Sequence, residues 1–288
     1  MGHHIVVCPA DAALLRRLAS RAVVLRVASL EAIDRAVDDA KQAETLLHCV
    51  VVESRHPLGL LTLEERWKDV PIALAVPSFG RLRDVVRLLP LIRQMNIRIS
   101  LPADSAESLT GLRILSSWGV ACMATPGSGS IPWDRFSDLG TYALFGLVPH
   151  GSIEPFDYLA KHYAANARTD FRGVWFEDPA RFVHMDASGR FAFSSGELAA
   201  GDFAGLIPDE VDGIGESDVY RERLESWRRV FLDKDGCASC PGWRICLGAF
   251  QDRAHTDPRC RDAFAELLDE IERHQTTARK ERRELWQV

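Results

Sequence analysis

The sequence predicts an α/β protein of two domains, and two observations carry that prediction. First, six short apolar runs rich in β-branched residues alternate with amphipathic stretches through the first ~145 residues, as in parallel β/α folds. Second, this alternation stops after Arg168, where a hairpin pattern, charged helices and four closely spaced cysteines follow. We therefore place a domain boundary near residue 170, which gives domains 1–170 and 171–288.

The six strand candidates are short, apolar and bounded by polar or turn residues. They are Ile5–Cys8, Val23–Val27, Leu47–Glu53, Ile72–Val76, Ile97–Leu101 and Val120–Ala124. Runs of this kind are typical of parallel strands that are covered by helices. Six strands are too few for a closed eight-fold barrel, so the pattern indicates either a partial (β/α)6 barrel or an open doubly wound sheet.

Helices are expected between these strands, where apolar residues recur every three or four positions. The candidates are Ala10–Ala19, Leu30–Ala43, Arg81–Gln94 and Glu107–Trp118. Pro90 predicts a kink in the third of them, and residues 54–69 are irregular or partly helical. The Gly-, Ser- and Pro-rich segment Thr125–Ser130 predicts a solvent loop, and a helix over Ile153–Asn166 closes this half. Neither a dinucleotide-binding nor a P-loop glycine motif is present, which disfavours nucleotide binding by such loops.

The second part has the pattern of an α+β domain. Val174–Phe176 predicts a strand, and Phe182–Met185 and Arg190–Phe193 flank a turn at Asp186–Gly189, which predicts a β-hairpin. An acidic stretch up to Asp218 follows. Two further helices are expected, over Val219–Leu232 and from Asp262 to Arg283, on either side of the cysteine segment.

Composition excludes several classes of function. The net charge is −6 and no basic stripe is present, which argues against a nucleic-acid partner. No apolar run approaches the ~18 residues that cross a membrane, and the N-terminus lacks a signal-peptide pattern. Seven cysteines without such a pattern indicate a reducing, cytoplasmic location. Cys8, Cys49 and Cys122 lie in apolar runs and are expected to pack in the core.

The other four cysteines, Cys237, Cys240, Cys246 and Cys260, have the spacing C-x2-C-x5-C-x13-C within polar sequence. Four thiols this close predict a metal site. Zinc favours tetrahedral thiolate sites built from paired knuckles, of which only one is present here. Iron–sulfur clusters tolerate more widely spread ligands, and disulfides are disfavoured by the compartment. Spacing alone leaves zinc and an iron–sulfur cluster open.

The segment Cys237-x2-Cys240-x5-Cys246, followed by Leu247–Phe250 and by Thr256-Asp257-Pro258-x-Cys260, resembles the C-terminal SPASM domain of radical SAM peptide-modifying enzymes. The resemblance covers about residues 172–262. It implies a twitch-like α+β domain, and it implies that Cys237, Cys240, Cys246 and Cys260 ligate one auxiliary [4Fe–4S] cluster. The family usually holds a second cluster on hairpin cysteines and one later cysteine. Here those positions are Ser194, Ser195 and Phe250, so only one cluster is expected.

The front half resembles the six-stranded partial barrel of radical SAM enzymes in a degenerate form. That family needs C-x3-C-x2-C after the first strand, but here Cys8 is followed by Ala12 and Leu15 at the aligned positions. No Gly-Gly-Glu element follows the second strand, and Ser195-Gly196-Glu197 lies in the other domain. We therefore expect no S-adenosylmethionine, no catalytic residues and no enzyme activity of the chain's own.

The resulting expectation is a non-catalytic iron–sulfur accessory protein. It would partner a radical SAM enzyme, its precursor peptide or both during maturation of a ribosomally synthesised peptide, with the cluster serving electron transfer or structure. The alternative is a β/α-barrel enzyme with a structural zinc ion held by the four cysteines. A self-sufficient radical enzyme with an unusual cluster site is a third interpretation.

The remaining polar residues have ordinary explanations. His255 is expected in a connecting turn, and Trp243 and Phe250 are expected to shield the metal from water. The carboxylates that could form an acid–base or cation site are expected to be solvated loop charges. They are Glu177, Asp178, Asp209, Glu210, Asp212, Glu216 and Asp218.

Overall fold

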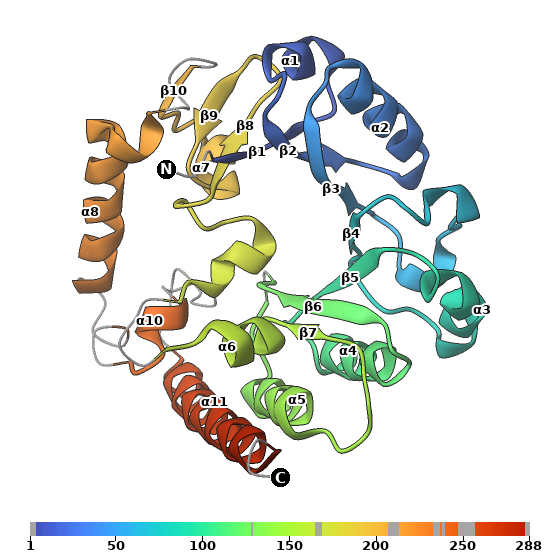
Figure 1. The fold of residues 1–288 in the computed structure, drawn as a ribbon, viewed down its shortest axis with the longest axis vertical. Coiled ribbons are helices and arrows are strands. Elements are labelled where there is room, and N and C mark those ends of the chain that lie inside the picture. Colours follow the sequence, from blue (N-terminus) through green and yellow to red (C-terminus); the bar gives the residue numbers. More distant parts are fainter. Residues whose placement is uncertain are drawn as a thin grey trace. The chain divides into compact units, whose positions relative to one another are not determined.

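The chain is an α/β protein with a mostly parallel sheet, as predicted (Figure 1). The fold comes from a computed structural model, which describes residues 4–127, 129–164, 169–206, 213–232, 237, 240–246 and 257–285. The described strands follow the order β10-β9-β8-β1-β2-β3-β4-β5-β6-β7. The chain divides into two compact units, Met1–Ser100 with Trp175–Arg229, and Leu101–Val174 with Val230–Val288. The predicted division into two domains, with a boundary near residue 170, stays a prediction.

In the first unit, consecutive parallel strands pair in the order in which they occur along the chain. They are β1 (Ile5–Pro9), β2 (Ala22–Val27), β3 (Leu46–Glu53), β4 (Ile72–Ala75) and β5 (Ile97–Pro102), and each matches a predicted strand. Their connections carry α1 (Ala12–Arg17), α2 (Ile33–Gln42), α3 (Leu82–Ile92) and the short 3-10 helices η1 (Leu30–Ala32), η2 (Leu58–Leu60) and η3 (Glu65–Trp67). The α-helices lie on the outer side of the strands in Figure 1. Pro90 lies inside α3, and the kink expected there stays a prediction.

The predicted hairpin is confirmed, and it extends the same sheet. Strand β8 (Phe182–Met185) pairs parallel with β1, and β9 (Arg190–Ala192) and β10 (Gly205–Leu206) continue antiparallel. Asp186 closes the turn, because its Oδ1 accepts from the backbone N–H groups of Ser188 and Arg190 at 2.9 and 3.0 Å. Helices α7 (Ser195–Ala200), η5 (Ile214–Glu216) and α8 (Asp218–Leu232) follow, the last as predicted.

The strand predicted over Val174–Phe176 is wrong. The chain instead forms a 3-10 helix, η4 (Phe171–Trp175), and Phe176 has φ 65°. A residue in the left-handed region cannot continue a strand. The run of β-branched and aromatic residues favours a strand locally, but the backbone turns there so that the Phe176 carbonyl accepts from His184 Nε2 at 3.0 Å.

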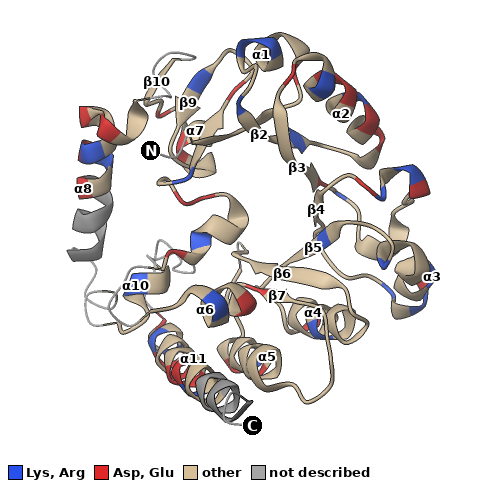
Figure 2. Ribbon diagram, in the orientation of Figure 1, with Lys and Arg blue, Asp and Glu red and all other residues tan. Residues whose placement is uncertain are grey.

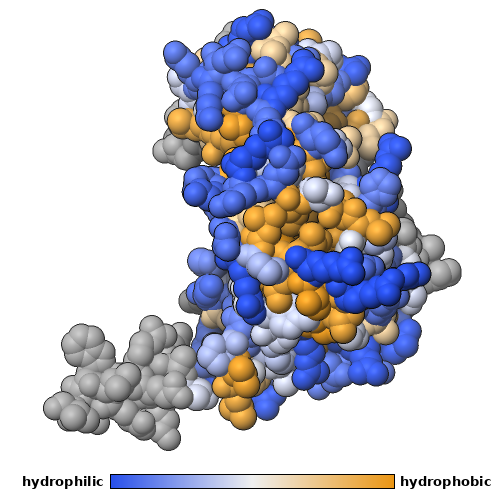
Figure 3. Space-filling view, turned by 90° about the vertical axis from the view of Figure 1, so that its right-hand side faces the viewer, coloured by the Kyte–Doolittle hydropathy of each residue, from blue (hydrophilic) through white to orange (hydrophobic). Residues whose placement is uncertain are grey.

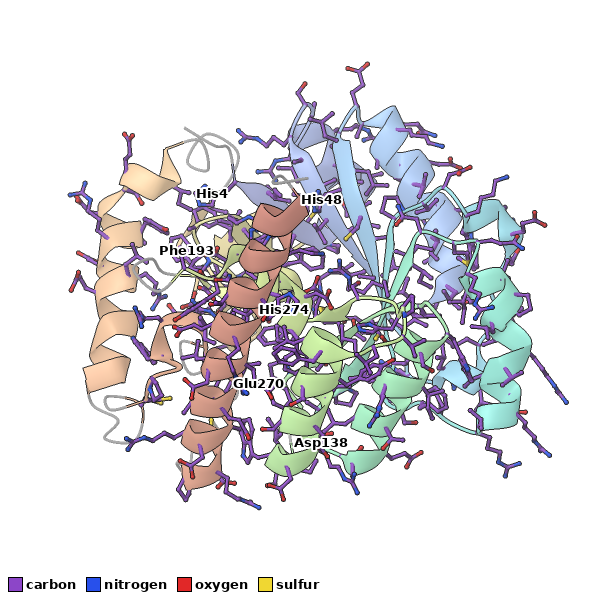
Figure 4. All side chains as sticks on the ribbon, turned by 60° about the horizontal axis from the view of Figure 1, so that its bottom comes forward. His4, His48, Asp138, Phe193, Glu270 and His274 are labelled. Atoms are coloured by element: carbon purple, nitrogen blue, oxygen red, sulfur yellow. The ribbon has the colours of Figure 1, made fainter. Side chains whose placement is uncertain are left out.

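The second unit contains β6 (Ala121–Thr125) paired parallel with β7 (Ile153–Glu154). Its helices are α4 (Ala106–Ser117), α5 (Trp133–Phe145), α6 (Phe156–His162), α10 (Trp243–Cys246) and α11 (Pro258–Leu285). Strand β6 and helices α4 and α11 were predicted, whereas α5 was not. Of the helix predicted over Ile153–Asn166, the part that α6 covers is confirmed, whereas its first two residues form strand β7. Helix α11 packs along α5, where Thr141 Oγ1 donates to the buried Glu270 at 2.6 Å (Figure 4).

Three cysteines pack in the interior as predicted. Cys8, Cys49 and Cys122 are all buried. Burial raises the pKa of the Cys8 and Cys49 thiols to about 12, so they stay protonated at neutral pH. They are therefore inert packing residues rather than reactive thiols. None of the helices that the structure describes is long and apolar enough to cross a lipid bilayer.

Candidate metal centre

The first three cysteines of the C-terminal group lie on a tight double turn. The N–H of Cys240 donates to the Cys237 carbonyl at 3.1 Å, and the N–H of Trp243 donates to the Cys240 carbonyl at 3.2 Å. The chain then enters α10, where the N–H of Cys246 donates to the Gly242 carbonyl at 2.9 Å. Such turns point neighbouring side chains to one side, which is how a C-x2-C segment serves one metal.

The fourth cysteine, Cys260, lies in the first turn of α11. Asp257 and Pro258 start this helix in the usual way, with a capping carboxylate followed by proline at the first helical position. The Asp257 carbonyl accepts from the Cys260 N–H at 3.0 Å, and its Oδ1 accepts from the Arg259 N–H at 3.1 Å. Cys260 is therefore held on an ordered helix start rather than on a free loop.

A close backbone contact joins these two segments. A Cβ added at Gly242 would lie only 2.5 Å from the Cβ of Phe264. Gly242 lies between Cys240 and Cys246, and Phe264 lies one helical turn after Cys260, on the same face of α11. Because only glycine permits this approach, Gly242 brings the cysteine turn against the start of α11.

The thiols are near enough to influence one another. Burial is the largest cause of a raised pKa at Cys260, and the neighbouring charges of Cys246, Cys240 and Cys237 raise it further. At Cys240, burial raises the pKa, while hydrogen bonds from the backbone N–H groups of Gly242 and Trp243 lower it. Thiolates that lie close together repel one another, which raises their pKa values. A bound cation attracts them instead, and so it favours the deprotonated thiolates. The donor set therefore fits a thiophilic metal ion or an iron–sulfur cluster.

The four cysteines, as the structure describes them, do not form a recognisable metal-binding group. In the part of the chain that the structure describes, no three His, Cys, Asp or Glu side chains lie in an arrangement that could hold a metal ion. All four cysteines are free thiols, so the disulfide alternative finds no support. The backbone nevertheless gathers the four residues in one neighbourhood, close enough for the charges of Cys237, Cys240 and Cys246 to act on Cys260.

An aromatic cluster lies beneath this neighbourhood. Phe264 is 1% exposed and stacks on Phe171, with ring centroids 6.0 Å apart and planes at 9°. Trp133 and Phe136 of α5 pack against the same ring at 6.1 and 6.2 Å. The sequence alone did not point to these residues, although Trp133 and Phe136 have helical spacing. Of the two predicted shielding residues, Trp243 is half-buried and Phe250 lies outside the described residues, as does His255.

Two of the carboxylates have defined structural roles. Glu177 Oε2 accepts from the Ser195 N–H at 3.1 Å and lies 3.4 Å from His184 Nε2. Asp178 is buried and accepts from the Ala180 N–H at 3.0 Å, so it is not the solvated charge expected from the sequence. Glu216 and Asp218 are exposed, as predicted. Asp209, Glu210 and Asp212 lie outside the described residues.

His184 is a buried polar residue that sequence reasoning did not single out. Its side chain is 2% exposed, and its Nε2 donates to the Phe176 carbonyl. Nδ1 is then the acceptor nitrogen, and it has no hydrogen-bond partner among the described residues. Burial is the largest cause of a lowered pKa at His184, Glu177 opposes it, and Arg26 adds to it. The imidazole is therefore neutral near pH 7.

Comparison with known proteins adds no family to this geometry. No protein-family model matches the chain, and no curated protein sequence does.

Proposed function

We propose that this chain is a non-catalytic iron–sulfur accessory protein that holds one [4Fe–4S] cluster on Cys237, Cys240, Cys246 and Cys260. Its partner would be a radical SAM enzyme that matures a ribosomally synthesised peptide. The observation that carries the proposal is the Gly242–Phe264 contact, since it brings together two segments that each carry cysteines of the SPASM-like spacing.

The surroundings of the cysteines favour a cluster over zinc. Only one knuckle is present, and the second pair of thiols comes from different elements, α10 and α11. A bulky cluster suits such spread ligands better than a single small ion does. When bound, a [4Fe–4S] cluster would supply one-electron transfer. The chain's own part is to donate backbone hydrogen bonds from Gly242 and Trp243 to Cys240 and to exclude water with the aromatic cluster.

The first unit supports the accessory role. Strands β1 to β5 pair in chain order, which is the winding of a barrel, whereas doubly wound sheets reverse their order. The segment after β1 offers no accessible set of thiols for a radical SAM cluster. Cys8 is fully buried, Asp11 caps α1, and Leu15 of α1 is buried in the core. A degenerate partial barrel without a radical centre therefore remains the proposed architecture.

The test begins with protein purified without oxygen. We expect about four irons and four sulfides per chain, a brown colour, and loss of both in Cys240→Ser and Cys260→Ser. Cys49→Ala, which removes a thiol from the core of the first unit, is the matched control and should keep its iron. Colourless protein with one zinc and no sulfide would overturn the cluster and favour the alternative.

The accessory role needs a second measurement. The purified protein should not cleave S-adenosylmethionine. A peptide maturation reaction rebuilt with a radical SAM enzyme from the same source should require this protein. Cleavage by the isolated protein would overturn the non-catalytic role. If Cys240→Ser remains folded and still binds that enzyme but modification stops, the cluster transfers electrons. Unfolding of the same variant would assign it a structural role.

One observation favours the alternative of a barrel enzyme with structural zinc. Arg26 and Glu53 form an ion pair at the carboxyl ends of β2 and β3, where barrel enzymes carry their catalytic groups. His184 with its oriented imidazole lies on β8, close enough to Arg26 for their charges to interact. If the protein is a zinc enzyme, His184→Gln should abolish its activity and leave the zinc content unchanged.

A further inference from the structure

Helix α3 turns apolar side chains outward as well as inward. Val85 and Ile92 are buried, as expected for the face against the sheet. Beside this face, Leu82 is 51% exposed and Val86 is 46% exposed, and the two are four residues apart, so they lie on one exposed stripe. An amphipathic helix of a solvated surface would carry polar residues there.

The neighbouring 3-10 helix η2 carries another exposed apolar side chain near this helix. A Cβ added at Gly59 would be 3.0 Å from Asp84 Cβ, so η2 packs directly against the first turn of α3. Leu60, the next residue, is 68% exposed. We call Leu82 and Val86 the α3 patch. Figure 3 views this side of the molecule and shows a hydrophobic area bordered by hydrophilic residues.

The border of the α3 patch is basic although the whole chain is acidic. The segment from Arg81 through Arg93 contains four arginines and one aspartate, in a protein of net charge −6 (Figure 2). Arg83 and Arg87 follow Leu82 and Val86 by one residue, so they flank the stripe along its length, and both are exposed. Apolar side chains between cations complement a segment that presents apolar and acidic residues together.

The size of the α3 patch indicates a short segment rather than a folded partner. Helix α3 has 11 residues, a length of about 16 Å. Two exposed apolar side chains fall far short of the roughly 20–30 residues a side that a stable protein interface uses. A single turn or two of helix, or a short extended peptide, matches these dimensions.

We infer that the α3 patch is a docking site for a short acidic, apolar segment of a peptide. The inference rests on the proposed function only in naming the source of that segment, which would be the precursor peptide. The patch lies in the first unit and uses none of the cysteines, so the iron content and peptide binding can succeed or fail independently.

Two designed 14-residue helical peptides test the inference by fluorescence anisotropy. Both carry leucine at helical spacing, and the other positions are glutamate in one and lysine in the other. We expect the glutamate peptide to bind at least tenfold more tightly, and high salt to weaken it. Val86→Asp and Arg83→Glu should each reduce its affinity at least fivefold. Leu147→Asp, which changes a 99% exposed leucine elsewhere, is the matched control and should bind like the wild type.

Other outcomes overturn the inference. Equal binding of both peptides would mean general hydrophobic adhesion, and no binding of either would remove the site. A dimer in sedimentation that Val86→Asp converts to a monomer would assign the patch to a second copy of the chain. Circular dichroism of each variant confirms that a lost affinity is not lost folding. If Cys240→Ser loses iron and still binds the glutamate peptide, the docking site stands apart from the cluster.

Discussion

Replacing Gly242 with alanine tests the contact on which the candidate metal centre depends. The new Cβ would lie 2.5 Å from Phe264 Cβ, 2.9 Å from Cγ and 3.2 Å from Cδ1. Unstrained carbon contacts lie at about 3.5–4.0 Å, so the first contact is short by about 1 Å. The Phe264 Cβ is fixed by the backbone of α11, and no rotamer change moves it. The cysteine turn must therefore shift away from α11, and overpacking of this kind costs about 1–3 kcal/mol of unfolding free energy.

The assay combines urea denaturation with iron analysis after anaerobic purification. Gly242→Ala should be destabilised by that amount and should hold less iron than the wild type. Gly213→Ala is the matched control, because no atom lies within 4 Å of its added Cβ and its φ is −109°. Its stability should stay within about 0.5 kcal/mol of the wild type. If Gly242→Ala has wild-type stability and full iron content, the contact does not position the cysteines.

Three further results are expected. Burial lowers the pKa of His184, as it does for His4 and His48, so the unfolded chain binds their protons at higher pH. The unfolding free energy should therefore fall as pH drops below about 6.5, by up to about 1.4 kcal/mol per pH unit for each proton. His184→Gln should reduce this slope in urea titrations, and an unchanged slope would contradict it. Ser194 caps α7 by accepting from the Glu197 N–H at 3.1 Å, so Ser194→Ala should lose about 1 kcal/mol while Ser195→Ala, next to it, loses less. Chelator treatment should expose the amides of α10 and of the start of α11 to hydrogen exchange and leave β1 to β4 protected; uniform loss of protection would argue against a local metal centre.

The structure also explains why Ser194 stands where the resemblance would place a cysteine. Its hydroxyl caps α7, and the Glu197 carboxylate accepts in return from the Phe193 N–H at 3.0 Å, which completes a capping box. The position therefore has a local structural role in this chain. The number of clusters stays a proposal.

Local patterns predicted most of the secondary structure. The strands β1 to β6 were readable because an apolar, β-branched run of four to eight residues has few other conformations available. The hairpin was readable because Asp186 to Gly189 carries its own turn chemistry. The failures were also local. Helix α5 follows a Gly-, Ser- and Pro-rich loop and contains Gly140, which weakens its pattern, and β7 is only two residues long.

The sequence by itself determined the alternation of strands and helices, the burial of Cys8, Cys49 and Cys122, and the four-cysteine spacing. Only the tertiary structure decided that β8 pairs with β1 across more than 170 residues, that Phe176 turns back to hold His184, and that Gly242 meets Phe264. Periodicity and turn chemistry depend on residues a few positions apart, so they can be recognised in a short segment of sequence. Contacts between distant segments depend on how whole faces pack together, and no local pattern specifies which faces meet.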